Sequence, residues 1–413
     1  MLLKNATYLN DSFQVVKGNL LIEDGKVSVL TSPCHHNEVV DCSDYVIIPG
    51  LYNAHFHGYS LLAKGIARDM KIEDWCNDTA QGKAQTKFFE NIDKLSKEDY
   101  QFVLMKAYIE MVKQGIVFAS ESEPSNWPES AAEALNNVGL KGFVDCYGDI
   151  ESYYDRKIGR ISFGTHLLEE EDITDETLKT CEDNKKRFDA LYLTHCMEND
   201  WRRDLIYSNY GKSSVELYHE RGLLDSQTVL FHGVHLQEND IDILSETGAS
   251  IVHCPVSNLW TGAGIAPVHN LLVKGANVCI GTDYGSVDIW ETMKMAYLLL
   301  KSNGPIQQNT ADTIFKMASY NGAIAYQQDA HGLIQDGFTA DLVFIKKDQA
   351  IPEIHTTNFS TIVHNLLMET KQESITHVMV DGEWIMYDQK LTKIDEHTIN
   401  QAYNRILTNV YND

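Results

Sequence analysis

An alternation of short apolar runs and helical segments is the feature that most constrains how this chain folds. Runs rich in β-branched residues recur through the 413-residue sequence, and stretches with helical periodicity, such as 98–113 and 289–301, lie between them. This alternation is typical of βαβ units around a parallel sheet. Eight candidate strands can be counted: 45–48, 116–119, 142–146, 161–164, 190–194, 228–231, 250–252 and 278–281. Eight such units over roughly 240 residues match the size of a (β/α)8 barrel.

The two ends of the chain have a different pattern, in which short strand-like runs flank Asp-Gly dipeptides. GNLLIEDGKVSVL near the start and VMVDGEWIMYD near the end are both of this kind, which favours β-hairpins. We therefore predict that residues 1–50 and 331–413 form one small β-sandwich-like domain and that residues 51–330 form the barrel. The predicted fold class is α/β, a (β/α)8 TIM barrel with an accessory domain built from both chain ends.

The charge of the chain excludes several classes of partner. Asp and Glu number 59 against 34 Lys and Arg, which gives a formal net charge of −25 at pH 7. Such a surface repels nucleic-acid phosphates and anionic membranes, so we expect neither as a partner. The start of the chain lacks a signal-peptide pattern, no run approaches 18 apolar residues, and the eight cysteines contain no C-x-x-C pair. We expect a cytoplasmic protein with reduced thiols.

Residues that can bind a metal ion or transfer protons follow four of the predicted strands, at the end of the barrel where active sites lie. They are His55 and His57 after the first strand, His195 and Glu198 after the fifth, His232 after the sixth and Asp283 after the eighth. Each signal has a structural alternative, such as a buried His or a helix N-cap Asp. The joint arrangement argues against four separate structural explanations. Three imidazoles and a carboxylate suit Zn²⁺, with Fe²⁺ or another first-row ion as the alternative.

Competing catalytic patterns are absent from the sequence. It contains no H-E-x-x-H, no G-x-S-x-G, no Walker A loop and no Rossmann glycine fingerprint. The P-C-x-x-C segment of the cytidine-deaminase zinc signature is also missing. Deaminase chemistry in this chain would therefore use a different scaffold.

Several segments of the chain resemble the amidohydrolase superfamily, specifically its branch of aminohydrolases and chlorohydrolases. PGLYNAHFHGYSLLAKGIARDMKIEDW is similar to the opening motif of that branch and LTHCMEND to its His-x-x-Glu segment. VLFHGVHLQENDIDILSETGASIVHCPVSNLWTGAGIAPVHNLLVKGANVCIGTD is similar to its longest signature. SYNGAIAYQQDAHGLIQDGFTADLVFI and VMVDGEWIM resemble its closing segments. The branch includes adenosine, S-adenosylhomocysteine, cytosine and guanine deaminases and triazine hydrolases.

The resemblance implies a role for each of these residues. His55, His57, His195 and Asp283 would bind one divalent ion, Asp283 would also exchange protons with the attacking water, Glu198 would be the proton shuttle, and His232 would be the electrophilic or orienting base. No Lys follows the fourth strand, where binuclear relatives place a carboxylated lysine, which implies a mononuclear site. A metal-activated hydroxide at such a site would hydrolyse a non-peptide C–N bond and deaminate an aminated heterocycle, such as a purine, pterin or pyrimidine.

Four further residues are candidates for contact with a small-molecule substrate. His166, after the fourth strand, resembles a substrate-contacting His of the S-adenosylhomocysteine deaminase group. Trp75 either stacks on a flat heterocycle or packs within a lid. Arg68, like Lys64, either lines that lid or is a solvated charge. His253 either touches substrate or satisfies backbone groups nearby.

Two segments depart from the branch and bear on the substrate. GTDYGSVDIW, which carries Tyr284, is shorter than the GTDGAASNN-like loop of relatives, and GTHLLEEED replaces a Gly-Pro-His-Ser-Pro-like sequence. Together with the lack of a Pro-x-Glu segment between residues 75 and 95, these departures argue against nucleoside specificity.

Other functions stay open at this point. The same site would suit a chlorohydrolase, an N-alkylamine hydrolase or a cyclic amidase. A noncatalytic binding protein is the third alternative, and the presence of every proposed ligand and proton carrier argues against it. Homo-oligomers are common in the family, and the sequence leaves the oligomeric state of this chain open.

Overall fold

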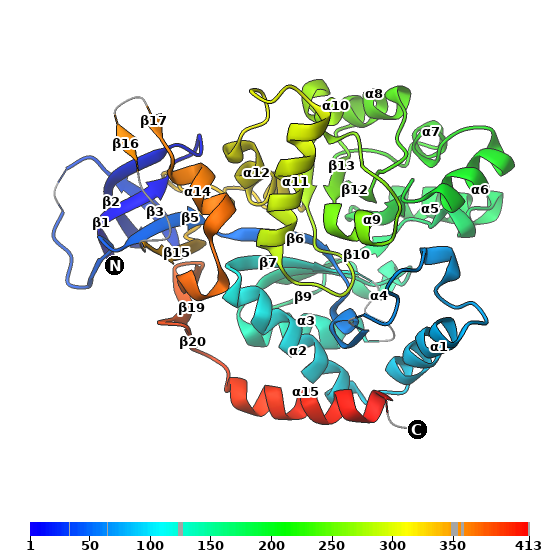
Figure 1. The fold of residues 1–413 in the computed structure, drawn as a ribbon, viewed down its shortest axis with the longest axis horizontal. Coiled ribbons are helices and arrows are strands. Elements are labelled where there is room, and N and C mark those ends of the chain that lie inside the picture. Colours follow the sequence, from blue (N-terminus) through cyan, green and yellow to red (C-terminus); the bar gives the residue numbers. More distant parts are fainter. Residues whose placement is uncertain (33, 64, 123–126, 348–353, 357–358, 412–413) are drawn as a thin grey trace.

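Eight parallel strands form the barrel sheet of the computed structural model, which describes residues 1–32, 34–63, 65–122, 127–347, 354–356 and 359–411. In order around the sheet they are β6 (Leu51–Phe56), β7 (Ile116–Glu121), β8 (Lys141–Asp145), β10 (Ile161–His166), β11 (Tyr192–Cys196), β12 (Thr228–His232), β13 (Ser250–His253) and β14 (Val278–Ile280). The short β9 (Lys157–Ile158) pairs with β10. A bridge between Phe56 and Asp283 joins the first strand to the end of the last. This arrangement confirms the predicted barrel (Figure 1).

Helices follow the strands and cover the outside of the barrel, as the alternation predicts (Figure 1). They are α1 (Ala80–Asp93), α2 (Lys97–Lys113), α3 (Pro128–Val138), α4 (Ile150–Tyr153), α5 (Asp175–Arg187), α6 (Asp200–Tyr210), α7 (Ser214–Glu220), α8 (Glu238–Thr247), α9 (Pro255–Trp260), α10 (Val268–Lys274), α11 (Ile289–Asn303), α12 (Ala311–Met317) and α13 (Tyr320–Ala325). The described residues also contain short 3₁₀ turns at Gly58–Ala63, Ile72–Asp74 and Glu170–Asp172, and another, Gln372–Ser374, just before β18 of the second sheet. Among the described residues, no helix has the length and apolar character needed to cross a membrane.

The first barrel strand lies later in the chain than predicted. The predicted strand 45–48 is β5 (Tyr45–Pro49), which pairs with β1 and β15 of the second sheet. The barrel begins with β6, which the prediction had treated as the segment after the strand. Gly50 separates the two strands, and a Cβ there would lie 2.4 Å from Cγ2 of Val117. The chain therefore passes between the sheets where only glycine fits against β7, and His55 lies inside a strand.

The second sheet draws on both ends of the chain, in agreement with the predicted architecture. Its strands are β1 (Leu2–Leu9), β2 (Val15–Glu23), β3 (Lys26–Leu30), β4 (Val39–Asp41), β5, β15 (Leu342–Lys346), β18 (Ile375–Val380), β19 (Glu383–Tyr387) and β20 (Lys390–Leu391). Asp24 (φ 50°) and Gly25 (φ 73°) form the turn of the β2–β3 hairpin with the positive φ angles that an Asp-Gly turn supplies. Leu3, Leu20, Ile47, Leu342 and Phe344 belong to a core of its own.

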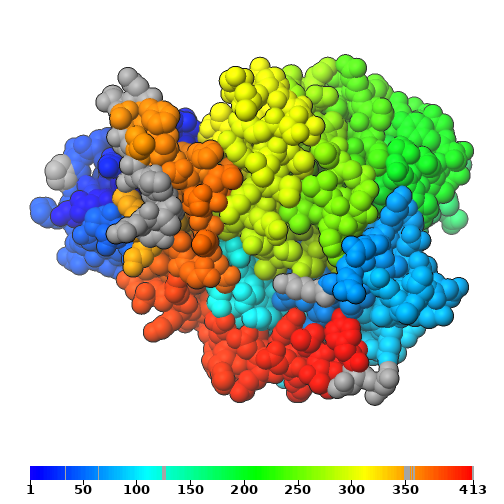
Figure 2. Space-filling model, in the orientation of Figure 1, coloured from blue at the N-terminus to red at the C-terminus, as the bar shows by residue number. Residues whose placement is uncertain are grey.

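The C-terminal helix α15 (Glu396–Tyr411) leaves the second sheet and lies against α1 and α2 of the barrel (Figures 1 and 2). The hydroxyl groups of Tyr403 and Tyr411 donate hydrogen bonds to the carbonyl oxygens of Leu61 (3.2 Å) and Leu62 (2.8 Å). The domain division at residues 50 and 331 stays a prediction. It assigns α15 to the accessory domain, whereas the helix lies against the barrel. Outside both sheets, β16 (His355–Thr356) pairs with β17 (Phe359–Ser360), and α14 (Ile362–Glu369) follows them.

Candidate metal centre and active site

Histidines from three strand ends gather around Asp283 at the C-terminal mouth of the barrel. Oδ1 of Asp283 lies 3.1 Å from Nε2 of His55 and 3.4 Å from Nε2 of His57, and its Oδ2 lies 3.8 Å from Nε2 of His232. The rings of His55 and His195 are 4.9 Å apart between centroids. Ligand atoms of His55, His195, His232 and Asp283 all lie within 4.8 Å of one another. The residues predicted from four separate segments therefore share one buried site.

The backbone at the strand ends adopts a conformation that non-glycine residues rarely take. His232 (φ 70°), which ends β12, Asp283 (φ 61°), which follows β14, and Met197 (φ 48°), which follows β11, all have left-handed backbone angles. Each such residue costs of order 1–3 kcal/mol and persists only where the surrounding structure imposes it. These turns aim the side chains of His232 and Asp283 into the barrel mouth.

Three of these imidazoles, those of His55, His195 and His232, have one nitrogen fixed by a polar neighbour outside the cluster. Nδ1 of His55 lies 3.0 Å from Oγ of Ser122, and Nδ1 of His195 lies 2.7 Å from Oε1 of Glu169. Nδ1 of His232 lies 2.8 Å from Oδ1 of Asn258, which accepts its proton. Contacts of this kind fix the ring orientation and leave the other nitrogen free to bind a metal.

The donor set fits a divalent cation. Burial lowers the pKa of His55 well below its usual value, although Asp283 opposes this, so the ring is neutral near pH 7. Burial raises the pKa of Asp283, but the facing rings of His232, His55 and His57 outweigh it and hold that pKa well below its usual value. Neutral imidazoles and an ionised carboxylate are the forms that ligate metals. The ligand set His55, His57, His195 and Asp283 stays a prediction. The four residues whose ligand atoms lie within 4.8 Å of one another include His232 in place of His57.

Two groups that can move protons flank this cluster. Oε1 of Glu198 lies 3.8 Å from Nε2 of His232, while Oε2 of the same carboxylate accepts a hydrogen bond of 2.9 Å from Nη1 of Arg202. Both Glu198 and His232 are buried. One carboxylate oxygen is thus fixed by a cation while the other faces the cluster, which suits a group that takes up and releases protons.

The predicted substrate residues have different surroundings. His166 has both nitrogens on carboxylates, with Nδ1 2.9 Å from Oδ2 of Asp145 and Nε2 2.5 Å from Oε1 of Glu169. Burial lowers its pKa, but those two carboxylates outweigh it and raise the pKa well above its usual value. Burial lowers the pKa of the His253 ring, at the end of β13, to about 3. Neither ring carries a direct sign of substrate contact, so both roles stay predictions.

The lid residues also differ in exposure. Trp75 is half-buried, with its ring centroid 4.8 Å from that of Tyr284 and 6.3 Å from that of Trp260. Arg68 is exposed, and its carbonyl oxygen accepts a hydrogen bond from the side chain of Gln81. Lys64 lies outside the residues that the structure describes. The substrate roles of Trp75 and Arg68 stay predictions.

A small cavity of about 200 Å³ adjoins Asp283 and is lined by Trp260, Tyr284, Val256, Ser257 and Thr282, among others. Oγ of Ser257 donates a hydrogen bond of 2.5 Å to Oδ2 of Asp283, which connects the cavity wall to the cluster. Aromatic and apolar walls of this kind accept the face of a flat ring.

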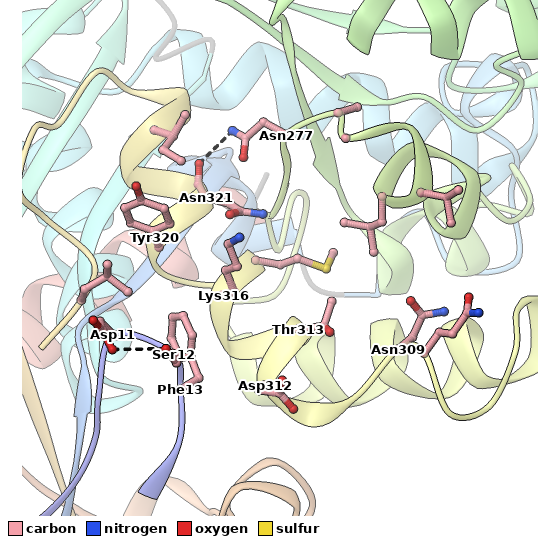
Figure 3. Close-up of a pocket in the computed structure, with 18 of the residues that line it drawn as sticks. Asp11, Ser12, Phe13, Asn277, Asn309, Asp312, Thr313, Lys316, Tyr320 and Asn321 are labelled. Carbon is pink, nitrogen blue, oxygen red and sulfur yellow. Dashed lines mark hydrogen bonds between the residues drawn. The ribbon is translucent and has the colours of Figure 1, made fainter. Parts of the chain in front are cut away.

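A larger cavity of about 940 Å³ lies elsewhere, between Asp11–Phe13 of the second sheet and residues of α12 and α13 (Figure 3). Among the described residues that line it, none belongs to the cluster around Asp283. No cluster residue is among the described residues that line the smaller cavity either, but Ser257 in its wall donates a hydrogen bond to Asp283, so the smaller cavity is the one in contact with the candidate active site.

Several residues of the site had no role assigned from the sequence. Glu169 lies in the GTHLLEEED segment, which departs from the family pattern, and Arg202 lies one helical turn after Glu198. Both are buried and contact site residues directly. The unusual run of acids after the fourth strand and the i,i+4 pair were the available signals.

Comparison with known proteins identifies the family. The model of the amidohydrolase family matches residues 46–385. This chain belongs to the amidohydrolase family. It is 28% identical over 428 residues to 5-methylthioadenosine/S-adenosylhomocysteine deaminase of Pyrococcus horikoshii, covering 97% of each chain. It is 28% identical over 431 residues to 5'-deoxyadenosine deaminase of Methanosarcina barkeri, covering 97% of this chain and 95% of that protein.

A solved relative shares the architecture over nearly the whole chain. The crystal structure of an adenosine deaminase from Xanthomonas campestris with bound zinc superposes with a TM-score of 0.87 at 20% identity, covering 99% of this chain and 98% of that one. The similarity confirms the fold. With the family established, this amidohydrolase is a hydrolytic enzyme whose buried histidine and aspartate cluster suits a divalent metal ion.

Proposed function

We propose that this amidohydrolase deaminates a small aminated heterocycle of the purine, pterin or pyrimidine type. The observation that carries the proposal is the arrangement of Glu198 and His232, whose facing atoms lie 3.8 Å apart beside Asp283. Zn²⁺ is the proposed ion, with His55, His57, His195 and Asp283 as its ligands, since imidazoles and one carboxylate suit zinc. The named deaminase relatives support the proposed reaction, and the zinc-containing structural neighbour supports the choice of ion.

The chemistry requires water to replace an amino group, with one proton added to the leaving ammonia. When bound, the ion supplies the Lewis acidity that makes water a nucleophile near pH 7. Glu198 accepts the proton of the attacking water at Oε1, protonates the ring nitrogen and then the departing amine. His232, whose Nδ1–H is held by Asn258, keeps Nε2 as an acceptor that aims the water. Asp283 takes up the second proton of the water and passes it by way of Glu198 to the departing amine, so that one proton ends on the ring nitrogen and the other on ammonia.

The surroundings of the site favour a substrate the size of a free base. The adjoining cavity of about 200 Å³ is smaller than the roughly 300–1,000 Å³ of sites for larger ligands. Trp260 and Tyr284 are nearly parallel, 17° apart, and offer faces for a flat ring. Trp75, Arg68, His166 and His253 are further proposed substrate contacts. The named relatives act on adenosine derivatives, so we expect this enzyme to share the reaction and to prefer a smaller substrate.

We also propose a cytoplasmic location, because all eight cysteines are free thiols and reduced cysteines are typical of that compartment. Homo-oligomer formation stays a prediction.

The test is a screen for ammonia release with the zinc-loaded protein. Adenine, guanine, pterin and cytosine compounds are assayed beside adenosine and methylthioadenosine, and we expect turnover of at least one free base above that of the nucleosides. Silence on all of them, with hydrolysis of a chlorinated triazine, an N-alkylated triazine or a lactam, would replace the deaminase proposal with one of the alternatives.

Elemental analysis tests the proposed metal ligands. We expect His55→Ala and Asp283→Asn to lose most of their zinc, whereas His269→Ala, which changes a histidine in the separate larger cavity, keeps it. Full zinc occupancy in both ligand variants would contradict the assignment.

A further inference from the structure

A buried carboxylate connects a proposed metal ligand to a second imidazole and to a guanidinium. Oε1 of Glu169 lies 2.7 Å from Nδ1 of His195 and 2.5 Å from Nε2 of His166, and its Oε2 lies 2.8 Å from Nη1 of Arg202. Glu169 is 4% exposed. Oε1 therefore contacts two imidazoles and Oε2 forms an ion pair with a guanidinium, so the position of Glu169 is set by residues from three elements of the barrel.

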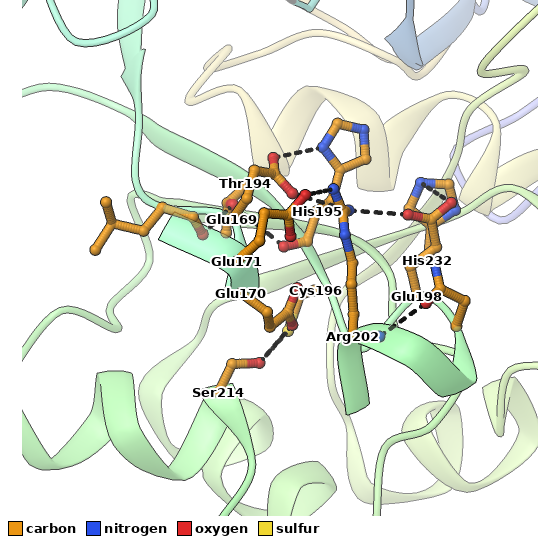
Figure 4. Close-up of polar contacts among 12 residues, drawn as sticks. Glu169, Glu170, Glu171, Thr194, His195, Cys196, Glu198, Arg202, Ser214 and His232 are labelled. Atoms are coloured by element: carbon orange, nitrogen blue, oxygen red, sulfur yellow. Dashed lines mark hydrogen bonds and ion pairs between the residues drawn. The ribbon is translucent and has the colours of Figure 1, made fainter. Parts of the chain in front are cut away.

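Arg202 extends this connection to the proposed proton shuttle. Nη1 of Arg202 lies 2.8 Å from Oε2 of Glu169 and 2.9 Å from Oε2 of Glu198, so one nitrogen is shared between the two carboxylates. Nη2 donates a hydrogen bond of 2.7 Å to Glu171. Figure 4 shows the guanidinium between the acidic segment 169–171 on one side and Glu198 beside His232 on the other.

The base of Arg202 is itself fixed by local structure. Asn199 is the N-cap of α6, and its side chain accepts a hydrogen bond of 2.9 Å from the backbone N–H of Arg202. Glu198 immediately precedes this cap, and Arg202 follows it within the first turn. The helix start therefore places the shuttle and its guanidinium partner together, at the side of the cluster where His195 enters from β11.

We propose that Glu169 and Arg202 are positioning residues for the metal centre and the proton shuttle. Glu169 accepts the Nδ1 proton of His195 and so fixes the tautomer whose Nε2 lone pair points away from it, which is the orientation a metal ligand needs. Arg202 ties this carboxylate to Glu198, so that the ligand and the proton carrier keep one relative placement. This inference rests on the proposed function in taking His195 as a metal ligand and Glu198 as the proton shuttle.

A second cation site is the competing interpretation of the same residues. Ligand atoms of His166, Glu169 and His195 also lie within 4.8 Å of one another. Nε2 of His166 and Nδ1 of His195, however, lie only 2.5 and 2.7 Å from the same oxygen, Oε1 of Glu169. Two atoms that bind one zinc ion at about 2.0–2.1 Å lie roughly 3 Å apart, so these contacts are hydrogen bonds and leave no room for an ion. The proposal therefore requires one zinc ion per chain.

The experiment measures zinc affinity directly, by competition with a chromophoric chelator, in the wild type and three variants. We expect Glu169→Gln, which keeps the side-chain volume and removes the charge, to weaken zinc binding about 10- to 100-fold, as is typical when a partner of a metal-bound histidine is changed. Glu171→Gln is the matched control, because Glu171 contacts Arg202 but neither His195 nor Glu198 in the described contacts, and we expect it to bind zinc within about threefold of wild type.

Arg202→Met addresses the connection to Glu198. We expect a lower kcat with little change in KM, together with partial recovery in Arg202→Lys, since a lysine restores the charge without the fork. The visible absorption of the Co²⁺-substituted protein should change in Glu169→Gln, because the geometry of His195 changes, and should stay unchanged in Glu171→Gln. A loss of folding alone would not alter a cobalt spectrum in this selective way.

The outcomes separate this inference from the proposed function. If the wild type binds no zinc, the proposed metal centre itself is wrong. If the wild type binds one zinc ion and Glu169→Gln has the same zinc affinity and cobalt spectrum, the positioning role is wrong but the metal centre stands. Two zinc ions bound per chain would also contradict the positioning role. If circular dichroism shows that Glu169→Gln does not fold, Glu169→Asp takes its place. The shorter side chain cannot reach both His195 and Arg202, so it should lose one of the two contacts.

Discussion

Buried charged groups gather at both ends of this barrel, and the two clusters are built differently. At the N-terminal end of β8, Nζ of Lys141 lies 2.7 Å from Oδ2 of Asp341 and 2.6 Å from Oδ1 of Asp381, and Arg160 pairs with the same Asp381 at 2.6 Å. Cations and carboxylates therefore alternate in direct contact. At the C-terminal end, Asp283 instead faces imidazole nitrogens.

This difference indicates that the cluster around Lys141 stabilises the fold, whereas the cluster around Asp283 serves chemistry. Lys141 belongs to the barrel while Asp341 and Asp381 flank strands of the second sheet, so the paired cluster joins the two units. The cluster at the mouth gathers lone pairs that only a cation or protons can satisfy, beside strained backbone at His232 and Asp283. Such an arrangement costs stability and serves function, as expected for the C-terminal face of a TIM barrel.

The largest expected effect tests the mouth. We expect Glu198→Gln to lower kcat about 10²- to 10⁴-fold, because the amide cannot carry the proton between water, ring nitrogen and leaving amine. Zinc content should be unchanged. The free energy of unfolding should change by about 1 kcal/mol, since Arg202 keeps its ion pairs with Glu169 and Glu171. The measurements are ammonia release, elemental analysis and urea unfolding. A variant with unchanged kcat would remove Glu198 from the mechanism.

The second prediction tests the opposite end. We expect Lys141→Met to lower the free energy of unfolding by about 3–5 kcal/mol, because Asp341 would keep its charge in a buried place without its cation. The kcat of the folded protein should stay that of the wild type. Urea unfolding and ammonia release check the two parts.

Lys179→Met is the control for this change, since the Lys179–Asp183 pair is exposed and such pairs contribute little to stability. A large loss of kcat in Lys141→Met, without loss of stability, would erase the contrast between the two ends.

The order of strands and the ends at which chemistry gathers follow from sequence, but the passage between the two sheets does not. Apolar alternation and Asp-Gly turns predict the barrel and the hairpins because both reflect local backbone preferences and burial. Residues 45–52 form one run without a charged or amide side chain, so its pattern does not separate β5 from β6. What divides them is the contact of Gly50 with Val117, which depends on tertiary packing.

The site shows the same limit. His55, His195 and Asp283 were predictable because each lies at a strand end, and strand ends of one barrel meet. Asn258 and Arg202 were not, because each acts on its partner through a contact made only in the folded chain. Glu169 is intermediate: its segment departs visibly from the family pattern, but a run of acids does not reveal which carboxylate reaches His195.

The smallest expected effect concerns a carboxylate at the mouth that has neutral hydrogen-bond donors. Glu121, at the end of β7, accepts hydrogen bonds from the backbone N–H of Gly58 (2.6 Å) and the hydroxyl of Tyr108 (2.8 Å). Burial raises its pKa from 4.5 to about 7, although both hydrogen bonds oppose the shift. The folded state therefore holds this proton more tightly than the unfolded state. The contribution to stability is complete below about pH 4.5 and is lost as the pH rises through about 7.

We expect Glu121→Gln to gain stability over the wild type between pH 5 and pH 8, by up to about 3 kcal/mol, because the amide stays neutral throughout. Urea unfolding at a series of pH values, with a chelator present to remove the effect of zinc, measures the difference. The exposed Glu90→Gln is the control and should follow the wild-type pH dependence. If the stability of Glu121→Gln depends on pH in the same way as that of the wild type, then burial does not disfavour the charged form of Glu121 in the folded state. The mouth of the barrel would then not hold a destabilising buried charge, and the contrast with the paired cluster around Lys141 would be wrong at this residue.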